Sequence, residues 1–267
     1  STHPFGSQMC SYLKRKGKIH AKIATIMTDF APHDQWLVGS DFTDYYFVAH
    51  DKMKQYLISK NIPEQHIFAT GIPLSKRFLE KHDKNKILKD FSLSENKRII
   101  LFFGGGEFGL GKSKTVEIFE SFVSFNHDLQ IIGIAGKNEK MKLAFENIVD
   151  KYNAKDRVRV LPFTDKVPEL MSVSTLVVTK PGGMTTTESL ASHLPMIIIN
   201  PIPGQEEENA EFLESKSIGI WIKKDTDVSS LLNDLFSNSN KLEIMKENTK
   251  LLAKPNSTKD ICEILLS

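Results

Sequence analysis

Two adjacent glycines at the start of an expected helix are the residues of this sequence best suited to chemistry. Residues 174–178 form a β-branched apolar run, Pro181, Gly182 and Gly183 follow as a turn, and residues 185–193 have helical composition. Glycines let a ligand approach the backbone closely, and the free N–H groups at a helix start attract a phosphate. The segment therefore predicts a strand, a tight turn and a helix whose first turn binds a pyrophosphate.

Polar side chains follow at positions where they can hold the rest of such a ligand. Thr185 adds a hydroxyl, and Glu188 lies about one turn into the helix, where its carboxylate can accept hydrogen bonds from both hydroxyls of a ribose. After the next apolar strand, residues 196–199, Gln205 and Glu206 reach the same end of the sheet and can hold sugar hydroxyls. A turn, a first-turn acid and an acidic helix start would explain these features singly. Their order and spacing together suit a nucleotide-sugar.

A second glycine-rich loop, residues 104–111, joins an expected strand to an expected helix. Gly106, Gly111, Lys112 and Ser113 satisfy G-x-x-x-x-G-K-S, the phosphate-binding motif of P-loop NTPases, in the strand-to-helix context that this motif requires. Such an enzyme also needs an acid at the end of a later strand to hold Mg²⁺. None of the later expected strands ends in an acid, so a P-loop NTPase is the less favoured alternative.

A pair of acids resembles a metal site. Asp225, Thr226 and Asp227 form a D-x-D pattern, which in another class of glycosyltransferase holds Mn²⁺ on a nucleotide-sugar. Thr226 or Asp227 also directly precedes the run 228–232, where a short polar side chain would cap the free N–H groups of a helix. A helix cap is the better explanation. No histidine or cysteine cluster has metal-ligand spacing, so no metal is expected.

Length and composition describe a globular protein without a membrane-spanning segment. The 267 residues are 40% hydrophobic, and no apolar run approaches the roughly 20 residues of a membrane span. The only cysteines, Cys10 and Cys262, lie at opposite ends of the chain, which argues against a disulfide framework and favours a reducing cytoplasm. The chain starts at Ser1 without Met and without signal-peptide features, so we expect it to be part of a longer protein.

Positive charge is concentrated near the N-terminus. Residues 1–86 contain 13 Lys and Arg against 8 Asp and Glu, whereas residues 87–267 contain 22 against 25. Much of the excess comes from Lys14, Arg15, Lys16, Lys18 and Lys22. Such a cluster can meet anionic phospholipid headgroups, at roughly 1 kcal/mol per residue near the surface, or it can be an ordinary solvated face. We expect an anionic membrane surface as a partner, and we expect no nucleic-acid partner.

The elements that would position these residues fall into two α/β units. In the first unit we expect strands at residues 23–27, 45–48 and 67–69 and a helix at residues 51–60. In the second unit strands and helices alternate, at residues 98–103, 112–125, 129–134, 139–152 and 157–160, before the segment described first. This alternation predicts a parallel sheet with helices on both faces and a ligand at the carboxyl ends of its strands. The expected domains are residues 1–80 and 98–267, joined by a Lys-rich linker at residues 81–97.

Five motifs together resemble the diacylglycerol glycosyltransferases: GGGEFGLGKS, KPGGMTTTESLA, PIPGQEEENAEFL, TDFAPHDQW and DYYFVAH. This family includes the processive diacylglycerol glucosyltransferases and the monogalactosyldiacylglycerol synthases, and it is related to the MurG-type N-acetylglucosaminyltransferase. The resemblance implies a GT-B fold, an α/β fold of two Rossmann-like domains with parallel sheets. The C-terminal domain would bind the UDP-sugar and the N-terminal domain, incomplete in this chain, would bind the lipid acceptor.

The resemblance also implies roles for individual residues. It places the diphosphate at Gly182, Gly183, Met184 and Thr185, the ribose at Glu188, the hexose at Gln205 and Glu206, and uracil near Phe163, with Gly104, Gly105 and Gly106 lining the cleft near the phosphates. In the family the catalytic base is associated with a glycine-rich, histidine-containing loop that this sequence lacks. The catalytic base is therefore not identified, and His3, Asp29 and His33 are the acceptor-side candidates.

The expected function is an inverting, metal-independent transfer of a hexose from a UDP-sugar to diacylglycerol. UDP-glucose is favoured as donor over UDP-galactose because the chain resembles the bacterial processive members. No cofactor is expected, and the protein would work peripherally at the cytoplasmic face of a membrane. The alternatives are the P-loop NTPase described above and a non-catalytic sugar-nucleotide-binding module.

Overall fold

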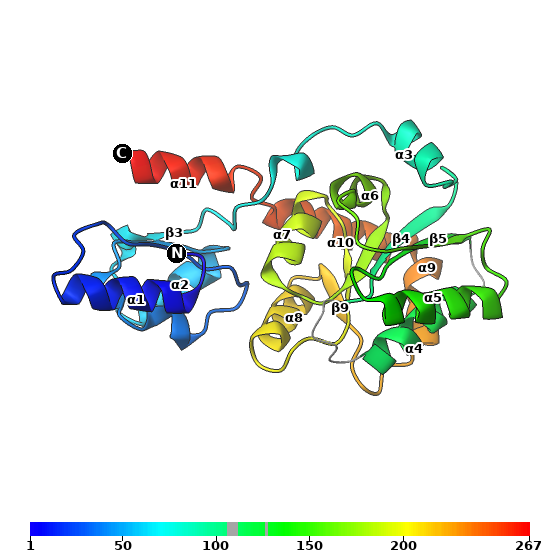
Figure 1. Ribbon diagram of the computed structural model, residues 1–267, viewed down its shortest axis with the longest axis horizontal. Helices are drawn as coiled ribbons and strands as arrows, with labels where there is room; N and C mark the ends of the chain where they lie inside the picture. Colours follow the sequence, from blue (N-terminus) through cyan, green and yellow to red (C-terminus); the bar gives the residue numbers. More distant parts are fainter. Residues whose placement is uncertain (106–111, 126–127) are drawn as a thin grey trace.

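The computed structural model describes residues 1–105, 112–125 and 128–267, and it shows two α/β units side by side (Figure 1). The first unit, blue to cyan in Figure 1, is built on a parallel three-stranded sheet in the order β1–β2–β3. Its elements are α1 (Pro4–Arg15), β1 (Ala24–Ile26), the 3-10 turns η1 (Asp34–Leu37) and η2 (Ser40–Phe42), β2 (Tyr45–Phe47), α2 (Asp51–Ser59), η3 (Glu64–His66) and β3 (Ile67–Phe68). All three strands lie within the ranges predicted for them.

The second unit is a six-stranded parallel sheet in the order β6–β5–β4–β7–β8–β9. Its strands are β4 (Arg98–Phe103), β5 (Leu129–Ile134), β6 (Val158–Leu161), β7 (Leu176–Thr179), β8 (Met196–Ile198) and β9 (Gly219–Trp221). The helices between and after them are α4 (Lys112–Ser124), α5 (Glu139–Lys151), α6 (Val167–Val173), α7 (Gly183–Ala191), α8 (Gln205–Ser215), α9 (Val228–Ser237) and α10 (Ser239–Leu252). Because the chain runs outward from β4 to β6 and then returns to β7, the strand order reverses between β4 and β7. A doubly wound sheet binds its ligand at such a point.

Strand β4 shows why this sheet is covered on both faces. Successive side chains of a strand point to opposite faces. Ile99 and Leu101 accordingly belong to one buried apolar cluster, and Ile100 and Phe102 belong to another. The first cluster continues into the first unit, so the two units share a continuous apolar contact. A run of apolar residues without polar alternation is therefore what this central strand requires.

The segments between and after the sheets connect the two units. The 3-10 turn η4 (Lys76–Phe78) and helix α3 (Lys84–Asp90) lie between the sheets in sequence. At the other end, α10 packs against α7, and α11 (Ser257–Leu266) returns to the side of the first unit (Figure 1). The Ser257 hydroxyl donates to the buried Ile72 carbonyl at 2.9 Å. No helix in the described part of the chain is long and apolar enough to cross a bilayer.

Candidate functional site

A cleft of about 350 Å³ opens where the strand order reverses, at the carboxyl ends of the parallel strands. Five residues named from the sequence line it, namely Gly105, Phe163, Gly182, Thr185 and Glu206. The other seven lining residues were not predicted as ligands; they are Phe103, Ile134, Gly136, Thr164, Val167, Thr179 and Lys180. The topology thus brings together segments that are about one hundred residues apart in the chain.

Helix α7 begins at this cleft with free backbone donors. Its N-cap is Gly182, which has no side chain to accept from the first turn, and the first backbone bond inside the helix runs from the Thr186 N–H to the Gly182 carbonyl at 2.9 Å. The N–H groups of the first three helical residues have no intrahelical acceptor and carry the positive end of the helix dipole. Lys180 adds a full positive charge to the lining of the same cleft. This end of the cleft is suited to an anionic group such as a diphosphate.

Glu188 lies on the sixth position of α7, because the helix begins at Gly183, two residues earlier than predicted. The side chain is half-buried, and burial raises the pKa of Glu188 to about 7. A half-buried carboxyl group whose pKa is raised by burial alone is a typical feature of a binding site, because a ligand can supply the missing hydrogen bonds. Glu188 is not among the residues that line the cleft, and its contact with the ribose stays a prediction.

The start of α8 is organised by its own acids. The Glu206 carboxylate accepts from the Ile202 N–H at 2.7 Å, and the Glu207 carboxylate accepts from the Gly204 N–H at 3.1 Å. These bonds fix the turn that follows β8. Glu206 faces the cleft, whereas the Gln205 side-chain amide donates to the Asp29 carboxylate of the first unit. Gln205, which we predicted to be a hexose ligand, therefore lies at the boundary of the two units.

The structure places other predicted binding residues outside the lining of the cleft. Gly104 is buried, and a β-carbon there would lie 2.9 Å from Met141 and 3.2 Å from Phe145. Met184 is exposed at the start of α7. Gly106 lies outside the described residues, as does Gly111 of the P-loop match.

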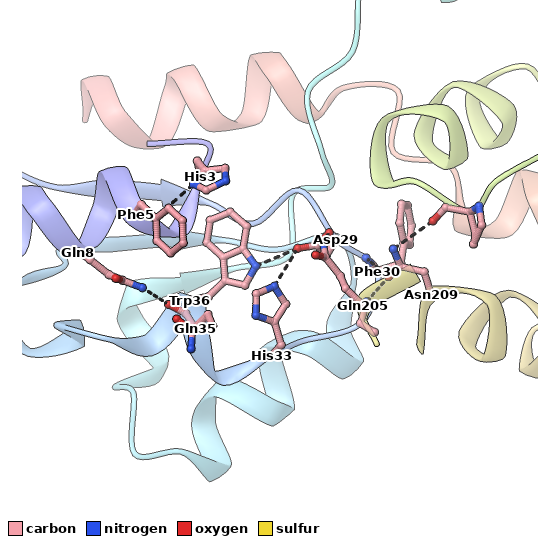
Figure 2. A network of polar contacts seen from close by, with 12 residues as sticks. His3, Phe5, Gln8, Asp29, Phe30, His33, Gln35, Trp36, Gln205 and Asn209 are labelled. Carbon is pink, nitrogen blue, oxygen red and sulfur yellow. Dashed lines mark hydrogen bonds and ion pairs between the residues drawn. The ribbon is translucent and has the colours of Figure 1, made fainter. Parts of the chain in front are cut away.

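The three acceptor-side candidates, His3, Asp29 and His33, lie in different surroundings (Figure 2). Asp29 is buried; its carboxylate accepts from the Trp36 indole at 2.9 Å and lies 3.4 Å from the His33 imidazole. His3 instead caps α1, where its ring nitrogen accepts from the Phe5 N–H at 3.3 Å. The fold therefore groups Asp29 with His33 beside Gln205, and it uses His3 as a helix cap.

Asn209 is a buried residue of α8 that the sequence analysis did not single out. Its side-chain oxygen accepts from the N–H groups of Phe30 and Ala31, at 2.9 and 2.8 Å, and its nitrogen donates to the Pro181 carbonyl at 3.1 Å (Figure 2). Nothing in its sequence neighbourhood signals these partners. A signal for Lys180 was available, since a cation directly before a predicted phosphate-binding turn is a natural ligand for a phosphate.

The D-x-D pattern is a helix cap, as predicted. The Asp227 carboxylate accepts from the N–H groups of Ser229 and Ser230, at 3.0 and 3.2 Å, at the start of α9. Within the described residues, no three histidine, cysteine, aspartate or glutamate side chains are grouped so that they could hold a metal ion.

Two family models match the chain, one in each unit. Residues 1–74 match the model described as monogalactosyldiacylglycerol (MGDG) synthase. Residues 99–261 match the model described as the glycosyltransferase family 28 C-terminal domain. The interval between the two matches contains α3.

Curated relatives cover nearly the whole chain. A processive diacylglycerol beta-glucosyltransferase of Bacillus licheniformis is 34% identical over 250 residues, which are 94% of this chain and 63% of that protein. A protein of the same name from Bacillus cereus is 33% identical over 255 residues, or 96% of this chain and 64% of that protein. The chain therefore spans a little under two thirds of the length of these relatives.

Solved structures show the fold. MurG of Acinetobacter baumannii superposes with a TM-score of 0.65 at 18% identity, covering 95% of this chain and 68% of that one. UDP-GlcNAc 2-epimerase of Neisseria meningitidis, solved with UDP-GlcNAc bound, gives a TM-score of 0.71 at 15% identity and covers 97% of this chain and 73% of that one. These likenesses confirm the predicted GT-B arrangement of two units with parallel sheets.

Proposed function

The chain belongs to glycosyltransferase family 28, and we propose that it forms the donor half and part of the acceptor half of an enzyme that transfers a hexose from a UDP-sugar to diacylglycerol. The observation that carries this proposal is the cleft at the reversal of strand order, where the uncapped start of α7 and Lys180 meet. The names of the two Bacillus relatives support diacylglycerol as acceptor and glucose, rather than galactose, as the hexose.

In this proposal the donor lies along the cleft from α7 to α8. The diphosphate binds at Gly182, Thr185 and the N–H groups of the first turn of α7, because Gly182, Thr185 and Lys180 line the cleft where that helix begins. Glu188 accepts from the ribose hydroxyls, and Gln205 and Glu206 hold the hexose. Phe163 lines the cleft with a ring that is 65% exposed, which supports it as the neighbour of uracil.

The proposed reaction inverts the anomeric carbon without a metal ion. The diacylglycerol hydroxyl attacks that carbon from the face opposite UDP, the bond from the carbon to the phosphate oxygen breaks, and UDP leaves with the bonding electrons. The α7 N-terminus and Lys180 stabilise the charge that develops on the diphosphate. A general base takes the hydroxyl proton. The resemblance to the family assigns that base to a loop that is not in this sequence, and within the sequence the pair Asp29 and His33 is the candidate.

Helix α1 supports a peripheral contact with an anionic bilayer at the cytoplasmic face. It faces the first unit with two serines, Ser7 and Ser11, which are both buried. Its exposed side carries Phe5, Met9 and Tyr12, and no acidic residue lies on the helix. An apolar face with basic residues at its end is typical of helices that lie in a membrane interface. The lipid acceptor would then be close to the first unit.

Titration calorimetry in EDTA tests the donor half directly. We expect UDP and UDP-glucose to bind without a divalent cation, and UDP-glucose to bind more tightly than UDP-galactose. Transfer of radiolabelled glucose to diacylglycerol in anionic vesicles tests the reaction itself. Failure of UDP to bind in EDTA, or binding of ATP that requires Mg²⁺, would overturn the proposal in favour of the P-loop alternative. UDP binding without transfer would favour the non-catalytic module.

A further inference from the structure

Asn209 connects three segments of the chain through one side chain. It is 1% exposed, its oxygen accepts from two N–H groups, of Phe30 and Ala31, and its nitrogen donates to the Pro181 carbonyl. A primary amide has two acceptor sites and two donors, so three of its four hydrogen-bonding positions are filled by backbone. Figure 2 shows the side chain between the two units, pointing from α8 toward the loop of the first unit.

Each of the three segments carries part of the proposed site. Phe30 and Ala31 directly follow Asp29, which lies in the acceptor-side loop. Pro181 directly precedes Gly182, the N-cap of α7, where we propose that the diphosphate binds. Helix α8, which carries Asn209, begins with the proposed hexose ligand Gln205. One amide on α8 therefore bonds both the loop that follows Asp29 and the turn that precedes the proposed diphosphate site.

The surroundings require an amide rather than an apolar side chain of similar size. Phe30 and Ala31 are 5% and 8% exposed, so their N–H groups would lose their partner away from bulk water if Asn209 were replaced by leucine. A carboxylate would keep both of these bonds, but it would place an oxygen against the Pro181 carbonyl. On the other side of the loop, the His50 ring nitrogen bonds the Phe30 carbonyl at 2.8 Å. The loop is thus held on both sides, and of these two side chains it is Asn209 that also bonds the turn at Pro181.

We propose that Asn209 is a positioning residue for sugar-nucleotide binding, which holds the turn at residues 181–182 in register with the loop at residues 29–31. This role rests on the proposed function, because it presumes that the donor diphosphate binds at that turn. Asn209 itself does not line the cleft. It acts through the Pro181 carbonyl, whose position sets the direction of the free N–H groups that follow.

The test compares Asn209→Ala and Asn209→Asp with a matched control, Gln130→Ala. Gln130 is also a buried amide, 3% exposed. Its side-chain oxygen accepts from the Ser94 N–H and its side-chain nitrogen donates to the Ser94 carbonyl, both at 2.9 Å, and neither residue lines the cleft. The parent and all variants carry Trp221→Phe, so that Trp36, one of the two tryptophans, is the only tryptophan left and can be excited selectively at a wavelength that tyrosine does not absorb. Trp36 reports on the loop because its indole bonds Asp29. UDP affinity is measured by calorimetry and the Trp36 emission maximum by fluorescence.

We expect both Asn209 variants to lose tenfold or more in UDP affinity and to shift the Trp36 emission, while Gln130→Ala lowers the melting temperature and changes neither quantity. Asn209→Asp keeps the size of the side chain and remains informative where Asn209→Ala does not fold. UDP affinity within twofold of the parent in a folded Asn209 variant, or an equal loss in Gln130→Ala, overturns the positioning role. A parent chain that binds no UDP overturns the proposed function instead, so the two failures are distinguishable.

Discussion

The backbone of Gly183 lies against the Thr28 carbonyl so closely that a β-carbon at position 183 would be 1.8 Å from the Thr28 oxygen. The sequence suggested that this glycine admits a diphosphate. The structure shows the backbone of the other unit in the space beside this glycine. Gly182, its neighbour, has no such restriction, because a β-carbon there would meet only Glu206 at an ordinary 3.9 Å. Adding a side chain at Gly183 and at Gly182 should therefore have different effects on the fold.

Gly183→Ala is expected to destabilise the chain, whereas Gly182→Ala is not. An added methyl group at position 183 must displace backbone, which typically costs about 1–3 kcal/mol, or roughly 2–12 °C in melting temperature at about 2–4 °C per kcal/mol. Gly182 has φ −67° and ψ 145°, a conformation that alanine adopts readily. Thermal unfolding measures the difference. Equal melting temperatures for the two variants would contradict the contact between Gly183 and Thr28.

The same two variants separate stability from binding. If the diphosphate lies against the backbone at residue 182, Gly182→Ala should weaken UDP binding although the melting temperature stays the same. Calorimetry at a temperature well below the melting point of both variants makes this comparison. If Gly182→Ala binds UDP as tightly as the parent, the diphosphate does not lie against the backbone of Gly182.

Glu188 predicts a pH dependence of donor affinity. Its pKa is about 7 in the free chain because burial disfavours the carboxylate, and a ribose that donates two hydroxyls would favour the carboxylate. Affinity should therefore be constant above pH 7 and fall by up to tenfold per pH unit below it. UDP-glucose is the suitable ligand, since its esterified diphosphate does not titrate in this range. Glu188→Gln should bind more weakly at pH 8 and lose the pH dependence.

Replacing Glu188 by alanine removes the acceptor altogether. Loss of a hydrogen bond to a charged group costs about 1.5–3 kcal/mol, which corresponds to roughly 10- to 150-fold in affinity. Glu211→Ala is the matched control, because Glu211 is an exposed acid on α8. If Glu188→Ala and Glu211→Ala bind UDP equally well, Glu188 is not the ribose ligand.

The same carboxyl group makes folding stability depend on pH. Its pKa is raised from 4.5 to about 7 on folding, so the folded chain binds the proton more tightly than the unfolded chain, and stability falls as pH rises from about 4.5 to 7. Above pH 7 the full cost remains, with an upper limit of about 3 kcal/mol at 1.36 kcal/mol per pKa unit. Glu188→Gln should thus be more stable than the parent at pH 8 and equal to it near pH 4. Denaturant unfolding at the two pH values checks this, and a variant less stable at pH 8 would contradict it.

Much of the second unit could be predicted because its strands are continuous apolar runs with glycine-rich ends. Strands β4 and β5 have the predicted bounds, Arg98–Phe103 and Leu129–Ile134. The short edge strand β9 was not predicted, since three residues beginning with Gly219 give no periodicity. Helix α1 was also missed, although the spacing of Phe5, Met9 and Tyr12 is helical.

The residues of the candidate site also differ in how far the sequence could place them. Gly182, Thr185 and Glu206 could be placed from sequence because each follows directly from a strand-to-helix turn at one end of a parallel sheet. Asn209 could not, because its partner Phe30 is 179 residues away and its role depends on how the two units meet. The bond from Gln205 to Asp29 could not be predicted either, because Asp29 lies in the other unit.

The exposed face of α1 predicts binding to anionic vesicles. Arg15 and Lys16 are exposed at the end of the helix and stay near the Tyr12 ring, with the Arg15 guanidinium 5.6 Å and the Lys16 ammonium 5.8 Å from its centroid. Each basic residue near an anionic surface contributes about 1 kcal/mol. The double variant Arg15→Glu, Lys16→Glu should therefore reduce binding to vesicles that contain phosphatidylglycerol by at least tenfold in a flotation assay. Binding of the parent should also weaken as salt is added.

The apolar part of this surface needs a variant of its own. Phe5 and Met9 are 67% and 59% exposed, so Phe5→Ser with Met9→Ser should weaken binding to the same vesicles without lowering the melting temperature. The matched control is Leu143→Ser with Leu251→Ser, since these leucines are 59% and 82% exposed on the second unit. If the control pair weakens binding as much as the α1 pair does, the contact is a general effect of exposed apolar area. If only the α1 pair and the charge variant weaken it, the helix lies in the interface with its apolar side toward the acyl chains.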